Sequence, residues 1–120
     1  MPYEIRIQRT FCAAHQVRLP DGTLEPLHGH NWTVTVTVGA DGLDGSGFVM
    51  DFHRLEKQLE GVLVQWNNRH LNETEAFSRL NPSAENIAYQ VARSLTLPAE
   101  VRLISVEITE APGCSALFRP

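Results

Sequence analysis

Apolar and polar residues alternate along two stretches in the first third of the chain. Between Tyr3 and His15, alternate positions hold tyrosine, isoleucine, phenylalanine and alanine, and the series ends in His15. Between His30 and Val38, a second series runs through tryptophan and valine. Because successive side chains of a strand point to opposite faces, each stretch predicts a long strand with one buried face. We expect the other face of the second strand to be exposed, and it carries Thr33, Thr35 and Thr37.

The spacing of the apolar residues becomes helical from Asp51, which lies at the positive end of the expected helix dipole. The apolar positions recur three or four residues apart and are Phe52, Leu55, Leu59, Val62 and Trp66. After a polar break at 67–72, Ser83 is a typical N-cap for a second helix, with Glu85 in its first turn, and Leu97-Pro98 ends it. The buried positions predicted for this helix are Ile87, Val91 and Leu95.

Alternation returns over residues 101–110. One face of this stretch carries Arg102, Ile104, Val106, Ile108 and Glu110. A short strand through 116–118 completes the order, which is strand, strand, helix, helix, strand, strand. This order predicts one α+β domain over residues 1–120, with both helices on one face of a four-stranded antiparallel sheet. Long strands with open edges also favour assembly with other copies of the chain.

Composition narrows the classes of function. The net charge is -4 and the basic residues are dispersed, which argues against nucleic acid as a partner. No apolar run is long enough to span a bilayer, and residues 1–6 lack the layout of a signal peptide, so we expect a cytoplasmic protein with no membrane partner. The glycine-rich segment 41–47 superficially resembles a calcium loop but lacks the remaining acidic ligands, so we interpret it as a solvated turn.

The only cysteines are Cys12 and Cys114. Two cysteines give no disulfide framework, and these two are not spaced as a zinc-binding pair. We predict two small thiols that are buried or half-buried. Cys12 is also a possible fourth metal ligand, but it alternates to the face opposite His15.

Three histidines fall where predicted strands meet loops, and they are His15, His28 and His30. Because alternate side chains of an extended chain share a face, His28 and His30 point the same way. Three neutral imidazoles, with a fourth position left for water or substrate, are typical of a catalytic zinc site. A structural zinc site usually closes with four protein ligands, commonly cysteines, so we disfavour that role. His53 and His70 belong to no such cluster, and we interpret them as surface or loop residues.

Glu110 ends the apolar face of the third predicted strand, just as histidines end the apolar faces of the first two. A carboxylate beside an apolar face is costly unless a cation or N–H groups satisfy it. A ligand with two adjacent donors would suit this position. A solvated strand end is an equally good interpretation from the spacing alone.

Several short motifs occur in order along the chain. They are Phe11-x-Ala13-Ala14-His15, Leu27-His28-Gly29-His30-Asn31, Gly47-Phe48-Val49-Met50-Asp51-Phe52, Leu71-Asn72, Asn81-Pro82-Ser83-x-Glu85-Asn86, and Glu110 with Phe118 eight residues on. Together they resemble the 6-pyruvoyl-tetrahydropterin synthase / 6-carboxytetrahydropterin synthase family over essentially the whole chain.

This resemblance implies the tunnelling fold, in which a unit of two helices and four strands trimerises into a barrel and two trimers stack as a hexamer. It implies Zn²⁺ on His15, His28 and His30. It also implies a pterin substrate held by Glu110 in a pocket shared between subunits, with Ser83 and Phe118 as further substrate contacts. The family substrate is 7,8-dihydroneopterin triphosphate, whose side-chain hydroxyls can chelate the metal.

The general base departs from the family pattern. The 6-carboxy and 6-pyruvoyl enzymes use a cysteine upstream of the His-Gly-His motif, and this chain has none there. It has Glu25, three residues before His28. The spacing Glu-x-x-His-Gly-His resembles a subgroup in which glutamate replaces the cysteine and the substrate side chain is cleaved to leave 6-hydroxymethyl-7,8-dihydropterin. We therefore predict Glu25 as the base, with an exposed loop acid as the alternative.

The residues at the proton-relay positions also differ from the family pattern. The family usually carries Asp-His just before an Arg-His-Leu-Asn stretch, where this chain has Asn67 and Asn68. An amide does not ionise near neutral pH, so these two residues can only orient a substrate or water. His70 is close enough in sequence to be a substitute, although no geometric reason favours it.

The sequence therefore supports two functions. The first is a zinc-dependent lyase or synthase that acts on 7,8-dihydroneopterin triphosphate or a close analogue through Glu25. The second, favoured by Asn67 and Asn68, is a zinc-containing homologue with an altered substrate or no synthase activity. A metal-binding barrel such as a cupin also has a His-x-His pair, but it needs a glutamate shortly afterwards, and residues 31–35 contain none.

Overall fold

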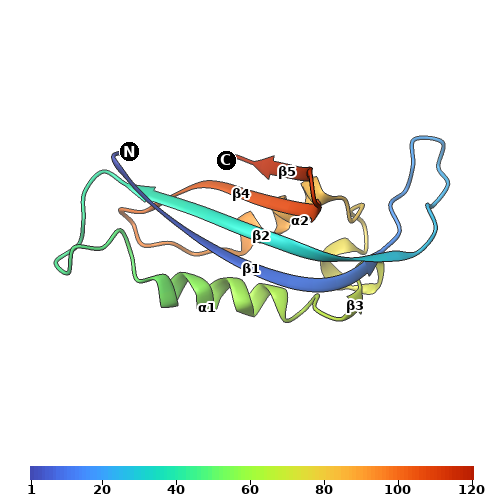
Figure 1. The fold of residues 1–120 in the computed structure, drawn as a ribbon, viewed down its shortest axis with the longest axis horizontal. Coiled ribbons are helices and arrows are strands. Elements are labelled where there is room, and N and C mark those ends of the chain that lie inside the picture. Colours follow the sequence, from blue (N-terminus) through green and yellow to red (C-terminus); the bar gives the residue numbers. More distant parts are fainter.

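The computed structural model describes residues 1–120 (Figure 1). Five strands form its sheet. In spatial order β3-β1-β2-β4-β5, they are β1 (Tyr3–His15), β2 (His28–Ala40), β3 (Arg69–His70), β4 (Arg102–Ala111) and β5 (Cys114–Phe118). The helices are α1 (Phe52–Leu63) and α2 (Ala84–Ser94), with short 3₁₀ turns at η1 (Leu71–Glu73) and η2 (Glu75–Phe77). The α+β class and the two helices are confirmed.

The sheet has one strand more than the four predicted, and that strand is parallel rather than antiparallel to its neighbour. Residues 69–70 pair with residues 13–14 of β1. Just before them, the side-chain oxygen of Asn67 accepts from the Cys12 N–H at 2.9 Å, and the Asn68 N–H donates to the Cys12 carbonyl at 2.6 Å. The expected polar break thus satisfies backbone groups along the edge of β1. A strand of two residues has no period from which it could be predicted.

The core lies between the helices and one face of the sheet. Its fully buried members from β2, α1 and α2 include Val34, Val36, Val38, Leu55, Leu59, Ile87 and Val91. The predicted helical stripe is wrong at both ends. Phe52 is 51% exposed, so the buried face of α1 begins at Leu55, and Trp66 is buried but lies in the turn after α1 ends at Leu63. Both helices have side-chain caps, since Asp51 accepts from the His53 N–H and Ser83 from the Asn86 N–H. Neither helix is long and apolar enough to cross a membrane.

The alternation predicted for β4 is wrong near its start. The pairing of β2 with β4 shifts by one residue between Thr37 and Val38. Such a bulge reverses which side chains face the core. As a result Leu103 packs against the core, and Ile104 does not.

The second face of β2 is also more buried than predicted. Thr35 and Thr37 are only 8% and 4% exposed. They lie on a central strand, and the side chains of Gln8 and Arg6 on the neighbouring β1 donate to their hydroxyls at 3.1 Å. Long polar side chains of β1 therefore cover the threonine hydroxyls.

The two cysteines are exposed free thiols, not buried or half-buried ones. Cys12 lies on the polar face near the end of β1, opposite Asn31 of β2. Cys114 opens β5 directly after Gly113, whose φ of 83° forms the turn from β4. Their positions on a polar face and beside a turn explain the exposure.

Antiparallel pairing brings distant parts of the chain together at one end of the sheet. The last residue of β1, His15, lies opposite the first residue of β2, His28, and Ala13 lies opposite His30. The loop 16–27 that joins these strands projects beyond the sheet at the right of Figure 1. Glu110 lies near the end of β4 that runs to the same place.

Candidate metal centre

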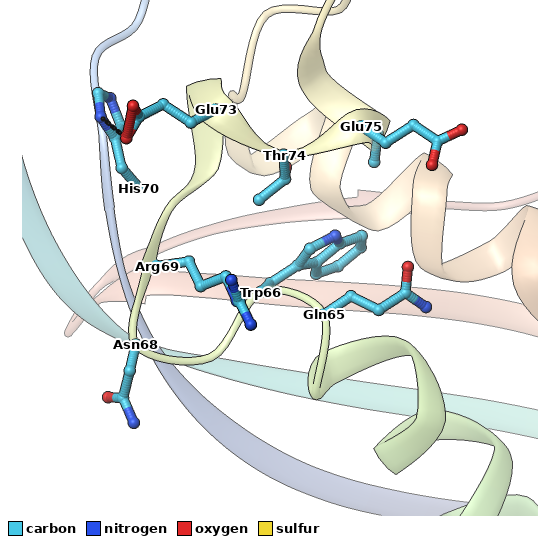
Figure 2. A pocket seen from close by; sticks show the side chains of 9 residues that line it. Gln65, Trp66, Asn68, Arg69, His70, Glu73, Thr74 and Glu75 are labelled. Atoms are coloured by element: carbon cyan, nitrogen blue, oxygen red, sulfur yellow. Dashed lines mark ion pairs between the residues drawn. The ribbon is translucent and has the colours of Figure 1, made fainter.

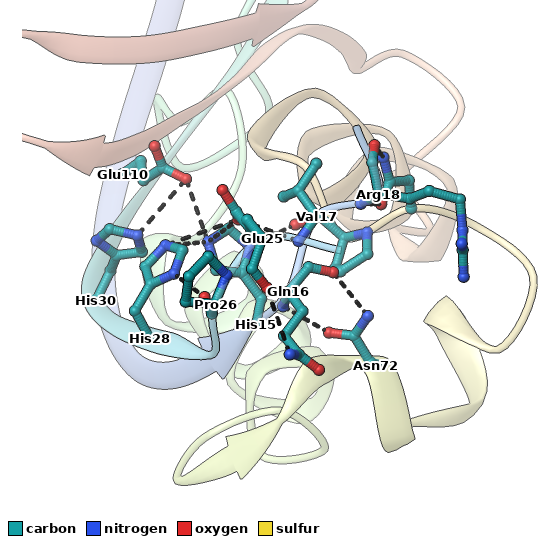
Figure 3. Close-up of polar contacts among 12 residues, drawn as sticks. His15, Gln16, Val17, Arg18, Glu25, Pro26, His28, His30, Asn72 and Glu110 are labelled. Carbon is teal, nitrogen blue, oxygen red and sulfur yellow. Dashed lines mark hydrogen bonds and ion pairs between the residues drawn. The ribbon is translucent and has the colours of Figure 1, made fainter. Parts of the chain in front are cut away.

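The side chains of His15, His28 and His30 converge on one point (Figure 3). One ligand atom from each lies within 4.8 Å of the other two. His15 is fully buried, and the other two side chains are partly exposed. The convergence agrees with the prediction from alternation, whereas the bound metal itself stays a prediction.

Backbone carbonyls fix the orientation of two of these rings. His15 Nδ1 lies 2.8 Å from the Pro82 carbonyl oxygen, and His28 Nδ1 lies 2.8 Å from the Pro26 carbonyl oxygen. A carbonyl only accepts, so both Nδ1 atoms carry the proton, and in the neutral rings both Nε2 atoms present a lone pair. These two Nε2 atoms are 3.1 Å apart. Two lone pairs that face each other at that separation repel unless a cation or a proton lies between them.

The third ring supplies a further test of whether Zn²⁺ fits. Nε2 of His30 is buried and has no hydrogen-bond partner, which is a costly arrangement for a polar atom. Burial lowers the pKa of His30, an effect that nearby Glu110 opposes and that His15 and His28 reinforce. The lowered pKa favours the neutral imidazole, which is the form that ligates a metal. Tetrahedral zinc with bonds of about 2.0–2.1 Å holds its nitrogens about 3.3 Å apart, close to the 3.1 Å between Nε2 of His15 and Nε2 of His28. Three imidazoles of this kind are a donor set that suits Zn²⁺.

Two carboxylates flank the three histidines on different sides. Glu110 Oε1 lies 3.5 Å from His15 Nε2 and 3.7 Å from His30 Nε2. Glu25 Oε1 lies 3.8 Å from Nε2 of both His15 and His28. The side chains of Glu25 and Glu110 are 26% and 33% exposed, so both can be reached by a ligand.

The loop that carries Glu25 is ordered by hydrogen bonds at its base. The Val17 N–H donates to Glu25 Oε1 at 3.0 Å, and the Glu25 N–H donates to the Val17 carbonyl at 3.0 Å. The neighbouring backbone is held by the side chains of Asn72 and Asn81. Neither asparagine was predicted to have a role, and the only signal in the sequence is their presence in the ordered motifs.

The relay positions do not join the histidines within one chain. His70 aligns with Ala14 on β1, so its side chain is directed to the face opposite His15. His70 lines a separate cavity of about 390 Å³, and its Nδ1 lies 3.3 Å from Glu73 Oε1. The side chain of Asn68 points away from His70 and Glu73 (Figure 2). Asn67 bonds to the backbone of β1. The orienting role of Asn67 and Asn68, and any role of His70, stay predictions.

The remaining predicted residues have structural contacts of their own. Ser83 Oγ accepts from the Asn86 N–H at 3.2 Å and caps α2, as predicted. Phe118 packs against Tyr89 with ring centroids 5.6 Å apart. Their predicted contacts with substrate stay predictions. His53 is a surface residue, with 91% of its side chain exposed.

Comparison with known proteins places this geometry in a family. Residues 4–120 match the family described as 6-pyruvoyl tetrahydropterin synthase. The chain is 34% identical over 112 residues to the dihydroneopterin monophosphate aldolase of Pyrococcus furiosus, covering 92% of this chain and 91% of the relative. It is 30% identical to the 6-carboxy-5,6,7,8-tetrahydropterin synthase of Bacillus subtilis, covering 99% of this chain and 88% of that enzyme.

A solved structure shares the fold along nearly the whole chain. The 6-pyruvoyl tetrahydropterin synthase of Caenorhabditis elegans superimposes with a TM-score of 0.84 at 23% identity, covering 98% of this chain and 95% of that one. The shared fold and the order of the motifs are consistent with the family match over residues 4–120. The chain belongs to the 6-pyruvoyl tetrahydropterin synthase family.

Proposed function

We propose that this protein is a zinc-dependent lyase that cleaves the side chain of a phosphate ester of 7,8-dihydroneopterin and releases 6-hydroxymethyl-7,8-dihydropterin. The observation that carries the proposal is the position of Glu25, whose carboxylate lies 3.8 Å from Nε2 of two of the three histidines. The similarity to an enzyme named as an aldolase of dihydroneopterin monophosphate supports the same reaction class.

The three histidines would hold Zn²⁺, which supplies Lewis acidity to the side-chain hydroxyls of the substrate. Glu25 accepts the proton of the 2′-hydroxyl as general base. The bond between C1′ and C2′ then breaks, C2′ becomes an aldehyde, and its bonding electrons pass to C1′ and the pterin ring. Glu25 returns the proton to C1′, so the products are 6-hydroxymethyl-7,8-dihydropterin and a two-carbon aldehyde phosphate.

Glu110 orients the ring. Its carboxylate accepts two parallel hydrogen bonds from the amino-pyrimidine edge of the pterin, which fixes the ring with respect to Glu25. Glu110 Oε1 lies 3.5 Å from His15 Nε2 and 3.7 Å from His30 Nε2, so the ring would bind beside the histidines. Asn67 and Asn68 are not required for proton transfer in this scheme, because one carboxylate both removes and returns the proton.

Product analysis tests this reaction directly. The zinc-loaded protein is incubated separately with the monophosphate and the triphosphate of 7,8-dihydroneopterin, alongside the aldolase of Pyrococcus furiosus as a working control. We expect 6-hydroxymethyl-7,8-dihydropterin from at least one substrate. Glu25→Gln should lower kcat by about 100-fold or more, typical of losing a general base, with zinc content unchanged. Absence of product from both substrates while the control turns over rejects the function.

The second candidate function is that of a homologue that retains the pocket but does not catalyse this cleavage. Asn67 and Asn68, which occupy the relay positions and cannot ionise, favour a homologue with a different pterin-like or purine-like substrate, or none. A thermal-shift screen of pterins and purines separates the two functions, because a ligand of the native pocket raises the unfolding midpoint. Stabilisation by a purine in the absence of any effect of dihydroneopterin phosphates would favour this alternative.

Assembly into trimers and hexamers is part of the proposal. The sheet has open edges at β3 and β5, and an unpaired edge is a ready site for pairing with another chain. A pterin pocket shared between subunits would then add groups from a neighbouring chain to the histidine face. Sedimentation velocity should give a hexamer, and a monomer at micromolar concentration would contradict this arrangement.

A further inference from the structure

Two side-chain amides each bond to both backbone groups of one residue in the segment that follows β1. Asn72 accepts from the Gln16 N–H at 2.9 Å and donates to the Gln16 carbonyl at 2.8 Å. Asn81 accepts from the Arg18 N–H at 2.8 Å and donates to the Arg18 carbonyl at 3.0 Å. The two asparagines thus occupy the place that a neighbouring strand would take.

The residue between them faces the other way. In extended backbone, successive residues direct their N–H and carbonyl groups to opposite edges. Val17 accordingly points its N–H and its carbonyl at Glu25, which bonds to both at 3.0 Å. Segment 16–18 is therefore a three-residue bridge, with the two asparagine side chains bonded along one edge and the proposed base bonded to Val17 on the other edge.

The segment that contains Asn81 also orients His15, one of the proposed metal ligands. Asn81 is followed by Pro82, whose carbonyl accepts from His15 Nδ1 at 2.8 Å. Asn72 belongs to η1, directly after β3. Movement of either asparagine would be transmitted to the Val17 N–H, which is the one group that donates to the carboxylate of Glu25.

We propose that Asn72 and Asn81 are positioning residues that hold the Glu25 carboxylate toward the histidines by fixing segment 16–18. This inference rests on the proposed function in one respect, namely that Glu25 is the base. The bridge itself does not depend on that function and has a readout of its own.

Amide hydrogen exchange measured by NMR on the metal-free protein provides that readout. Asn72→Ala and Asn81→Ala leave the acceptor of the Val17 N–H intact, because that acceptor is Glu25. We expect the Val17 amide to exchange at least fivefold faster in both variants, with the core amide of Val36 unchanged. An increase below fivefold at Val17, or an equal increase at Val36, overturns the inference.

The chain offers a matched control variant. Gln58 holds Thr96 in the same way, accepting from its N–H at 2.8 Å and donating to its carbonyl at 2.7 Å, but it does so between α1 and the segment after α2. Gln58→Ala removes an equivalent pair of bonds far from the histidines in sequence. It should leave exchange at Val17 as in the unchanged protein, and acceleration there would also overturn the inference.

Kinetics of the zinc-loaded protein with a dihydroneopterin phosphate then test the effect on Glu25. Asn72→Ala and Asn81→Ala should lower kcat by about 10- to 100-fold, the range typical of outer positioning groups, with KM within twofold and Gln58→Ala unaffected. Adding Asn72→Ala to Glu25→Gln should lower kcat no further, because both act through one group. A further loss would contradict positioning through Glu25. If the unchanged protein forms no product, the proposed function fails, and the exchange experiment still decides whether the bridge exists.

Discussion

The indole of Trp32 stands edge-on against the imidazole of His15, with ring centroids 4.9 Å apart and ring planes at 87°. Its ring is also 5.0 Å from that of His30. The indole N–H donates to the Ala13 carbonyl at 3.1 Å, and Trp32 is fully buried. The floor of the candidate metal centre is therefore part of the hydrophobic core, which couples the positions of two candidate ligands, His15 and His30, to core packing.

Trp32→Phe should weaken both the fold and the metal site. The change leaves the buried Ala13 carbonyl without its donor and opens a small cavity, so we expect the free energy of unfolding to fall by about 2–4 kcal/mol. Urea unfolding of the metal-free protein measures this loss, and a competitive chelator measures zinc affinity. Trp66→Phe is the control, because Trp66 is also buried, at 3% exposure, but its ring packs against Phe11 and Phe77 and not against the histidines. Equal losses of zinc affinity in both variants would contradict the coupling.

His30→Ala should abolish stoichiometric zinc binding without unfolding the chain. Nε2 of His30 is buried and unpartnered, so the metal-free fold loses no hydrogen bond from it. Zinc should raise the unfolding midpoint of the unchanged protein and leave that of the variant unmoved. Metal analysis and thermal unfolding check both statements, with His53→Ala as a surface control. Zinc retained in full by His30→Ala would exclude this ring as a ligand.

The convergence of the histidines could be predicted because it depends only on local periodicity and on strand ends. His28 and His30 share a face by alternation, and pairing of consecutive strands brings His15 opposite His28. The bulge that puts Leu103 in the core could not be predicted, because one inserted residue leaves no trace in the pattern. The burial of Thr35 depends in the same way on a neighbouring strand's side chain.

The contacts that order the Glu25 loop could not be predicted for a different reason. Asn72 and Asn81 reach backbone groups that are 56 and 63 residues away in sequence. A bond between a side chain and a distant backbone has no period and no charge partner that would mark it. The short strand β3 also escapes prediction, since it has two residues.

Glu110→Gln should weaken binding of the pterin ring while zinc stays bound. A carboxylate accepts two charge-assisted bonds from the amino-pyrimidine edge, and an amide presents a donor in place of one acceptor. We expect the Kd of a pterin, measured by fluorescence titration, to rise by about 10- to 100-fold, equivalent to losing one bond to a charged group. Glu107→Gln is the matched control, because Glu107 pairs with Thr35 and faces the opposite side of β4. Similar affinity in the two variants would remove Glu110 from ring recognition.

The pH dependence of stability should include a contribution from the contact between β1 and α1. Arg9 bonds to Glu56 at 2.5 Å and to Glu60 at 3.2 Å. The hydrogen bond from Arg9 is the main cause that holds the pKa of Glu56 below its ordinary value of 4.5, with burial opposing it. A carboxyl whose pKa is lower in the folded state stabilises the fold above its unfolded pKa and loses that contribution as the pH falls through its folded pKa.

Urea unfolding of the metal-free protein at a series of pH values from 7 downward checks this expectation. The free energy of unfolding should fall as the pH drops below 4.5, the ordinary pKa of this group, because the unfolded state then binds more protons. Glu56→Gln should be less stable at neutral pH and should lose less stability on acidification. Glu75→Gln, at an exposed position in η2, is the control and should retain the slope of the unchanged protein. An unchanged slope in Glu56→Gln would show that the Arg9 contact contributes nothing to acid stability.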